Sequence, residues 1–166
     1  MSVQRNKLGI TDIFKLETVE HQLVKSKLDI LDSTFTFGQT QFDVAYLQEL
    51  HNFLFGDIYY EEDLAIRSRY TVAALEQIDA SFLQLNECGA NQDIDCETLT
   101  ATIENLWELQ LFHDGNTRTL WGFLKTYIEA FQLPMELSMT TDELSMCGDV
   151  RPYRAFQLSK KKVSQR

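Results

Sequence analysis

Residues that end helices are rare along this chain. Only two prolines and seven glycines occur in 166 residues. Since both residue types disfavour a helix interior, their scarcity leaves long stretches able to form helices. Strand-like alternation of apolar and polar residues is nearly absent, and 34–37 is the single weak candidate. The sequence therefore predicts an all-α fold.

Apolar side chains recur at helical spacing in five segments, at 11–31, 42–54, 70–85, 96–111 and 119–133. Thr11 or Asp12 is a suitable N-cap for the first segment, and Pro134 stops the last one. A further short helix is predicted within 135–150. Predicted loops and breaks separate these segments at 33–39, 55–57 and 88–93.

The length of the chain favours one domain with a full core. We expect a single helical domain over 1–150 and a basic tail over 151–166. No run approaches the roughly 18 to 20 apolar residues of a membrane span, and the first residues lack a signal-peptide core. Three cysteines without paired spacing favour reduced thiols over disulfides or a zinc site. A cytoplasmic location is the resulting expectation.

Charge is distributed unevenly along the chain. The formal net charge is −10, from 15 Lys and Arg against 25 Asp and Glu. All the acidic residues precede residue 151, together with nine basic residues, which gives that part −16 (9 − 25). The other six basic residues lie in 151–166, where we expect a frayed, solvated terminus. An acidic body argues against general nucleic-acid binding, which needs a basic surface.

Residues 110–118 read QLFHDGNTR and lead into the helical segment at 119–133. A chain that turns at a glycine and then starts a helix directs backbone N–H groups and the positive end of the helix dipole at one point. Arg118 adds a cation with five donors that suits phosphate. Asp114 supplies the hard oxygen ligand that Mg²⁺ prefers. The combination predicts a nucleotide-phosphate site.

This stretch resembles the motif of the Fic family, His-x-Phe-x-Asp/Glu-Gly-Asn-Gly-Arg, in which some members have Thr at the second Gly. The matching residues are Phe112, Asp114, Gly115, Asn116, Thr117 and Arg118. The catalytic histidine of the family is Gln110 here. Residues 6–12 (NKLGITD) and 42–59 are similar to two further segments of many bacterial Fic proteins. The resemblance covers about 5–135 and implies an all-α Fic fold with the phosphate-binding loop between two long central helices.

The resemblance also implies roles for the loop residues. Asp114 would bind Mg²⁺, and the phosphates of ATP or another nucleotide would be held by Gly115, Asn116, Thr117 and Arg118. In the family, the histidine removes the proton of a target hydroxyl, which then receives AMP from ATP. A β-hairpin flap positions the target chain in the family, and residues 68–71 indicate that this flap is shortened or absent. Docking of a protein target is therefore less strongly implied than nucleotide binding.

The glutamine at position 110 decides how much of this activity is expected. A carboxamide does not take up a proton near neutral pH, so it cannot serve as a general base. Loss of a general base typically costs about 10²–10⁴ in rate, although glutamine still makes hydrogen bonds. Gln110 is thus a natural loss of the base, a sign of different chemistry, or an engineered change. His113 is interpreted as a solvent-facing loop residue and His51 as buried and hydrogen-bonded.

Three functions remain open. The first is a catalytically impaired Fic protein that still binds a nucleotide or a partner, and the second is an active nucleotidyl- or phosphoryl-transferase with another base. The third is a purely structural helical interaction module. Many Fic proteins carry an inhibitory helix, Ser/Thr-x-x-x-Glu-Gly/Asn, and 100–105 matches this pattern. Because this segment directly precedes the phosphate loop, we interpret the match as chance and place Glu104 on a solvated helix face. The oligomeric state is not predicted.

Overall fold

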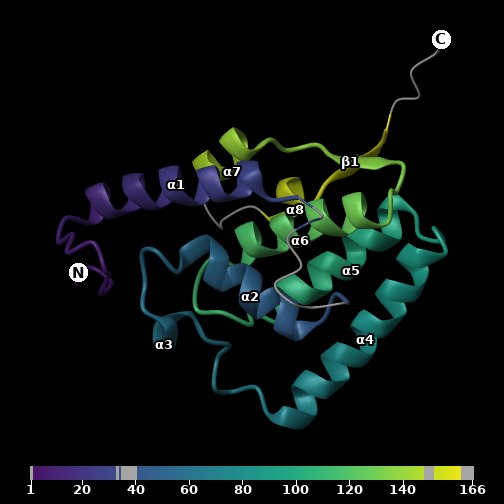
Figure 1. The fold of residues 1–166 in the computed structure, drawn as a ribbon, viewed down its shortest axis with the longest axis horizontal. Helices are drawn as coiled ribbons and strands as arrows, with labels where there is room; N and C mark the ends of the chain where they lie inside the picture. The colour runs from purple at the N-terminus through teal and green to yellow at the C-terminus, as the bar shows by residue number, and fades with distance from the viewer. Residues whose placement is uncertain (1, 33, 35–40, 148–151, 162–166) are drawn as a thin grey trace.

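The computed structural model describes residues 2–32, 34, 41–147 and 152–161 (Figure 1). Its longer helices are α1 (Ile13–Ile30), α2 (Val44–Phe55), α4 (Val72–Ala90), α5 (Cys96–Glu108) and α6 (Asn116–Ala130). The shorter ones are α3 (Glu61–Leu64), α7 (Thr141–Cys147) and α8 (Pro152–Ala155). Two short strands, β1 (Met135–Leu137) and β2 (Leu158–Lys160), form an antiparallel pair. The predicted all-α class is confirmed, with this small sheet as its one addition in the described part of the chain.

Side chains of Asp and Thr start four of the five long helices. Asp12, Asp43, Thr71 and Asp95 each accept a hydrogen bond from the backbone N–H three residues further on. Such caps satisfy N–H groups that the first helical turn leaves without partners. Asp12 was one of the two caps predicted for the first helix. The fifth long helix, α6, begins differently and lies at the candidate site.

Helix α6 forms the centre of the domain. Only Lys125, Glu129 and Ala130 of its fifteen residues are not buried. Helices α2 and α5 and strand β1 all contact α6 (Figure 1), while α7 lies along α1. Phe42, just before α2, makes edge-on contacts with Phe123 and Tyr127 of α6. The buried position of α6 fixes the loop that precedes it.

Several predicted boundaries were wrong by a few residues. Helix α5 ends at Glu108 rather than 111, and α6 begins at Asn116 rather than 119. Gln110 has a left-handed φ of 47° and cannot continue the right-handed helix α5. Gly115, with a φ of 78°, is the N-cap residue of α6. Helix α4 continues to Ala90, so the loop predicted at 88–93 begins later. The predicted loop at 33–39 and the strand candidate at 34–37 lie almost wholly outside the described residues.

The C-terminal segment is folded where a frayed terminus was expected. The predicted boundary at residue 150 lies outside the described residues, but 152–161 pack on the helical body. Ala155 and Phe156 are buried, and the Thr100 hydroxyl donates to the Phe156 carbonyl at 3.2 Å. Ala155 and Phe156 are therefore not part of a solvated tail, whereas the basic residues Arg154, Lys160 and Lys161 are exposed. No helix in the described ranges is long and apolar enough to cross a membrane.

Candidate functional site

The loop from Leu109 to Gly115 joins α5 to α6 and contains the predicted site residues. Gln110 lies at its start, and both atoms of its carboxamide are engaged. Its Nε2 donates to the Trp107 carbonyl at 2.8 Å, and its Oε1 accepts from Asn116 Nδ2 at 3.2 Å. Gln110 therefore connects the last turn of α5 to the first residue of α6.

The side chains of Asn116 and Thr117 point into the loop and the neighbouring helix. Asn116 Oδ1 accepts from the Phe112 N–H at 3.1 Å, and its Nδ2 donates to the Phe112 carbonyl at 2.9 Å. The Thr117 hydroxyl oxygen accepts from Trp107 Nε1 at 2.9 Å. These contacts hold the loop in one shape. They also mean that Asn116 and Thr117 would meet a ligand through their backbone and not through their side chains.

Gly115 is the N-cap of α6 and has a φ of 78°. A Cβ atom at this position would lie 2.5 Å from the Phe55 ring, so glycine is required for two separate reasons. Unlike the other long helices, α6 begins with no side-chain cap. Asp114 Oδ1 accepts from the Gly115 N–H at 2.8 Å, so the carboxylate is held at the helix entrance. A negative group is favourable at that end of a helix.

Arg118 is buried and paired with an acidic residue from the first helix. Its Nη1 lies 2.7 Å from Glu20 Oε1, its guanidinium lies over the Phe55 ring, and the arginine is only 4% exposed. The other oxygen of Glu20 accepts a hydrogen bond from the Tyr59 hydroxyl. Burial, followed by the adjacent carboxylate of Glu20, raises the pKa of Tyr59 far above its usual value. Glu20 of α1 is thus an acidic partner of Arg118.

The pairing of Glu20 with Arg118 and Tyr59 was not found from the sequence. One signal was present, since Glu20 lies between Leu16 and Val24 on the buried stripe of α1. A carboxylate on an apolar stripe requires a buried partner. The sequence could not identify that partner, which is 98 residues away.

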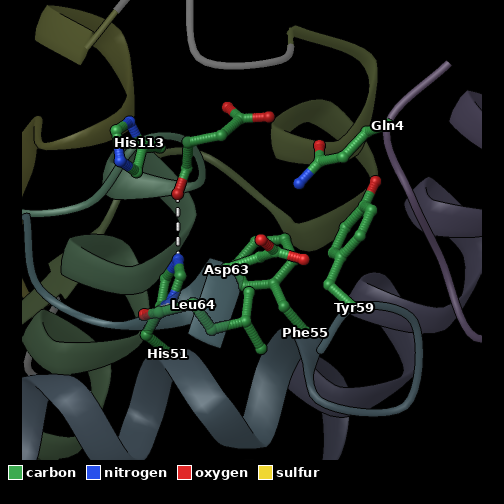
Figure 2. A pocket seen from close by; sticks show the side chains of 8 residues that line it. Gln4, His51, Phe55, Tyr59, Asp63, Leu64 and His113 are labelled. Atoms are coloured by element: carbon green, nitrogen blue, oxygen red, sulfur yellow. Dashed lines mark hydrogen bonds between the residues drawn. The ribbon is translucent and has the colours of Figure 1, made fainter. Parts of the chain in front are cut away.

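His51 of α2 contacts the loop between α5 and α6. Its Nδ1 lies 3.1 Å from the Leu64 carbonyl oxygen and its Nε2 lies 2.9 Å from that of Asp114, the contact dashed in Figure 2. Its ring stacks on Phe112 with centroids 3.9 Å apart. The predicted buried, hydrogen-bonded role of His51 is confirmed, and His113 is exposed as expected.

Only part of the predicted site borders open space. Asp114 and Arg118 line a cleft of about 510 Å³ together with Gln4, Glu20 and Tyr59. Gln110, Asn116 and Thr117 do not belong to its lining. A second cavity of about 20 Å³ lies beside it, between His51, Tyr59, Asp114 and the inward-pointing side chain of Gln4 (Figure 2). That volume suffices for one water molecule.

The donor set suits a metal ion only together with another ligand. No group of three or more His, Cys, Asp or Glu in the described part of the chain could hold a metal ion. Mg²⁺ is commonly bound by one or two carboxylates plus substrate phosphates and water. Asp114 therefore fits as a single protein ligand to a phosphate-bound Mg²⁺.

The segment before α4 contains no hairpin. Within 65–71 the chain forms turns, and the Arg67 N–H donates to the Leu111 carbonyl at 2.8 Å. Arg69 and the Tyr70 hydroxyl both donate to the Leu109 carbonyl. These contacts hold the segment against the loop that leads to Gly115. They leave no strand of the flap kind between Ala65 and Thr71.

Comparison with known proteins identifies the fold. No protein-family model matches the chain, and no curated protein matches it. A solved structure with a TM-score of 0.55 is described as the N-terminal Fic domain of a cell filamentation protein, a VirB-translocated Bep effector, from Bartonella quintana. The match covers 82% of this chain and 73% of that one at 18% identity. At this identity the likeness establishes the all-α Fic fold alone.

Proposed function

We propose that this protein is related to the Fic adenylyltransferases, binds a nucleotide with Mg²⁺ beside Asp114, and has lost most or all of its transfer activity. The observation that carries the proposal is the position of Gln110. By the resemblance of 110–118 to the family motif it stands at the position of the histidine, and its carboxamide links Trp107 to Asn116. Both polar atoms of the Gln110 side chain are engaged in hydrogen bonds within the protein, and neither is a basic nitrogen. Gln110 therefore cannot act as a general base.

The start of α6 supports nucleotide binding. The helix begins without a side-chain cap, although Asp or Thr caps each of the other long helices. The positive end of a helix attracts phosphate, and a glycine allows close approach. Asp114 stands at this point and lines the open cleft. Asp114 would hold the ion, and Mg²⁺ when bound would neutralise phosphate charge.

Glu20 limits the affinity that we propose. A phosphate oxygen that uses Arg118 must compete with a carboxylate 2.7 Å away in a buried setting. Such a pair is costly to break, since each charge loses its partner. We therefore expect weak binding by the natural chain and tighter binding once Glu20 is neutralised.

A second candidate, a helical interaction module without ligand, is favoured by the inward contacts of the loop. Asn116 and Thr117 are both satisfied within the protein. Under this alternative the loop is a structural relic, and the protein acts through a protein partner. A cytoplasmic location stays a prediction under either function.

Titration calorimetry with a non-hydrolysable ATP analogue, with and without Mg²⁺, separates the two candidates. We expect Mg²⁺-dependent binding to Glu20→Gln that Asp114→Ala and Arg118→Ala abolish, while Arg154→Ala, at an exposed arginine of α8, serves as the control. Absence of binding to both the natural chain and Glu20→Gln would leave only the interaction module.

Labelled ATP incubated with a cell lysate tests transfer. We expect no labelling by the natural chain, and restored labelling by Gln110→His would show that the base is the missing part. Robust labelling by the natural chain would contradict the loss of activity and support an enzyme with another base.

A further inference from the structure

Tyr59 is a buried tyrosine at the candidate site. It follows α2, is 5% exposed, and lines both the open cleft and the water-sized cavity (Figure 2). Its hydroxyl donates to Glu20 Oε2, while Glu20 Oε1 accepts from Arg118. Both oxygens of one carboxylate are therefore occupied by donors from two other parts of the chain.

The two donors fix the direction of the Glu20 carboxylate. Arg118 belongs to α6, Tyr59 to the segment after α2, and Glu20 to α1. A glutamate has three rotatable side-chain bonds, and Glu20 also borders the open cleft. If Arg118 were its only donor, the Glu20 carboxylate would become hydrated by turning toward that cleft. The hydroxyl of Tyr59 opposes this movement.

We propose that Tyr59 is the positioning residue that keeps Glu20 on Arg118, so that its hydroxyl sets how readily the arginine becomes available to an anion. This inference rests on the proposed function for the identity of the anion, a nucleotide phosphate. The arrangement of the three side chains does not depend on that identity. Loss of the hydroxyl loosens the carboxylate and exposes the guanidinium.

Chemical modification of the arginines tests this step without a nucleotide. Phenylglyoxal reacts with accessible guanidinium groups, and peptide mass spectrometry measures the rate at each arginine. We expect Arg118 to react much more slowly than exposed Arg69 in the natural chain. Tyr59→Phe should raise the Arg118 rate by about tenfold or more, the factor expected from one hydrogen bond to a charged group.

Tyr127→Phe is the matched control. Tyr127 is also buried, and its hydroxyl donates to the Leu85 carbonyl at 2.7 Å, away from the cleft. The same change there lowers stability without touching Glu20. An Arg118 rate in Tyr59→Phe no higher than in Tyr127→Phe would overturn the proposal, as would a lower rate than in the natural chain.

A double substitution shows whether Tyr59 acts through Glu20. In a Glu20→Gln background, Tyr59→Phe should change the Arg118 rate less than twofold. An undiminished effect in that background would refute the positioning role. If circular dichroism shows that Tyr59→Phe does not fold, Glu20→Asp replaces it, because the shorter carboxylate cannot reach both donors. A raised Arg118 rate in Glu20→Asp supports the proposal, and an unchanged rate overturns it.

The nucleotide arm keeps the two proposals apart. Tyr59→Phe should also bind the ATP analogue more tightly than the natural chain. A faster Arg118 reaction without analogue binding in any variant would support the positioning role of Tyr59 and contradict the proposed nucleotide function. If the analogue binds equally well to Tyr59→Phe and to the natural chain, and the Arg118 rate is also unchanged, the nucleotide function is supported and the positioning role of Tyr59 is contradicted.

Discussion

Gln110 and Asn116 are joined by a hydrogen bond of 3.2 Å across the loop between α5 and α6. The bond joins a residue with a left-handed φ of 47° to the first residue of a buried helix. It gives the glutamine at this position a structural role. The carboxamide accepts a hydrogen bond from Asn116 and donates one to the Trp107 carbonyl.

Replacement of Gln110 by alanine should lower the free energy of unfolding by about 1–3 kcal/mol, because two hydrogen bonds of about 0.5–1.5 kcal/mol each are lost. Urea unfolding followed by circular dichroism measures this change. Gln132→Ala is the control, since Gln132 has a similar φ of 51° and its side chain makes no hydrogen bond within the described residues. Equal losses in the two variants would show that the backbone, and not the carboxamide, is responsible.

Replacement of Gly115 by alanine should be more damaging than the same change at Gly9. Both glycines have positive φ, 78° and 67°, but only Gly115 would place its Cβ against another side chain, the Phe55 ring. We expect a loss of about 1 kcal/mol for Gly9→Ala from backbone strain. For Gly115→Ala the added displacement of Phe55 raises the expected loss to about 2–4 kcal/mol. Thermal unfolding of both variants measures the difference, and similar melting temperatures would argue against the close approach.

Periodicity and cap chemistry predicted most of the helices, because both depend on neighbouring residues. Asp12 illustrates this, since its cap bond reaches only Lys15. The end of α5 was misplaced because Gln110 adopts a left-handed backbone that glutamine does not signal. The start of α6 is set by Gly115, the N-cap residue with a left-handed φ of 78°. Strand β1 has three residues and is too short for an alternating pattern to be recognised. The partner strand, β2, lies in the basic C-terminal segment, which we expected to be a solvated terminus because of its charge.

The sequence predicted where along the chain the loop of the candidate site lies, but not which residues from other elements contact it. Asp114 borders an open cleft as expected for a ligand residue. Arg118 does so too, yet it is held by Glu20, a tertiary contact that local sequence does not encode. The same holds for Tyr59, which became part of the site only through folding.

Phe156 should anchor the C-terminal segment to the helical body. It is fully buried, and its carbonyl accepts from the Thr100 hydroxyl. Phe156→Ala should cost about 3–5 kcal/mol in the free energy of unfolding, as for other buried aromatic residues. Leu158→Ala, at a half-buried position of β2, should cost clearly less. Urea unfolding of the two variants tests this order, and a Phe156→Ala protein as stable as the natural chain would restore the solvated-tail prediction.

Asp95 should make the stability of α5 depend on pH in acid solution. Hydrogen bonds from Thr98, first from its backbone N–H at 2.7 Å, lower the pKa of the Asp95 carboxyl. A carboxyl whose pKa is lower in the folded protein stabilises the fold above its unfolded pKa, about 3.9, and this contribution disappears as the pH falls through the folded pKa. Asp95→Ala should therefore unfold at a lower urea concentration than the natural chain at pH 7, and the gap should shrink at pH 3. Asp95→Asn, which can still cap the helix, should lose only the part due to charge. A gap that is the same at both pH values would show that the charge of Asp95 contributes nothing.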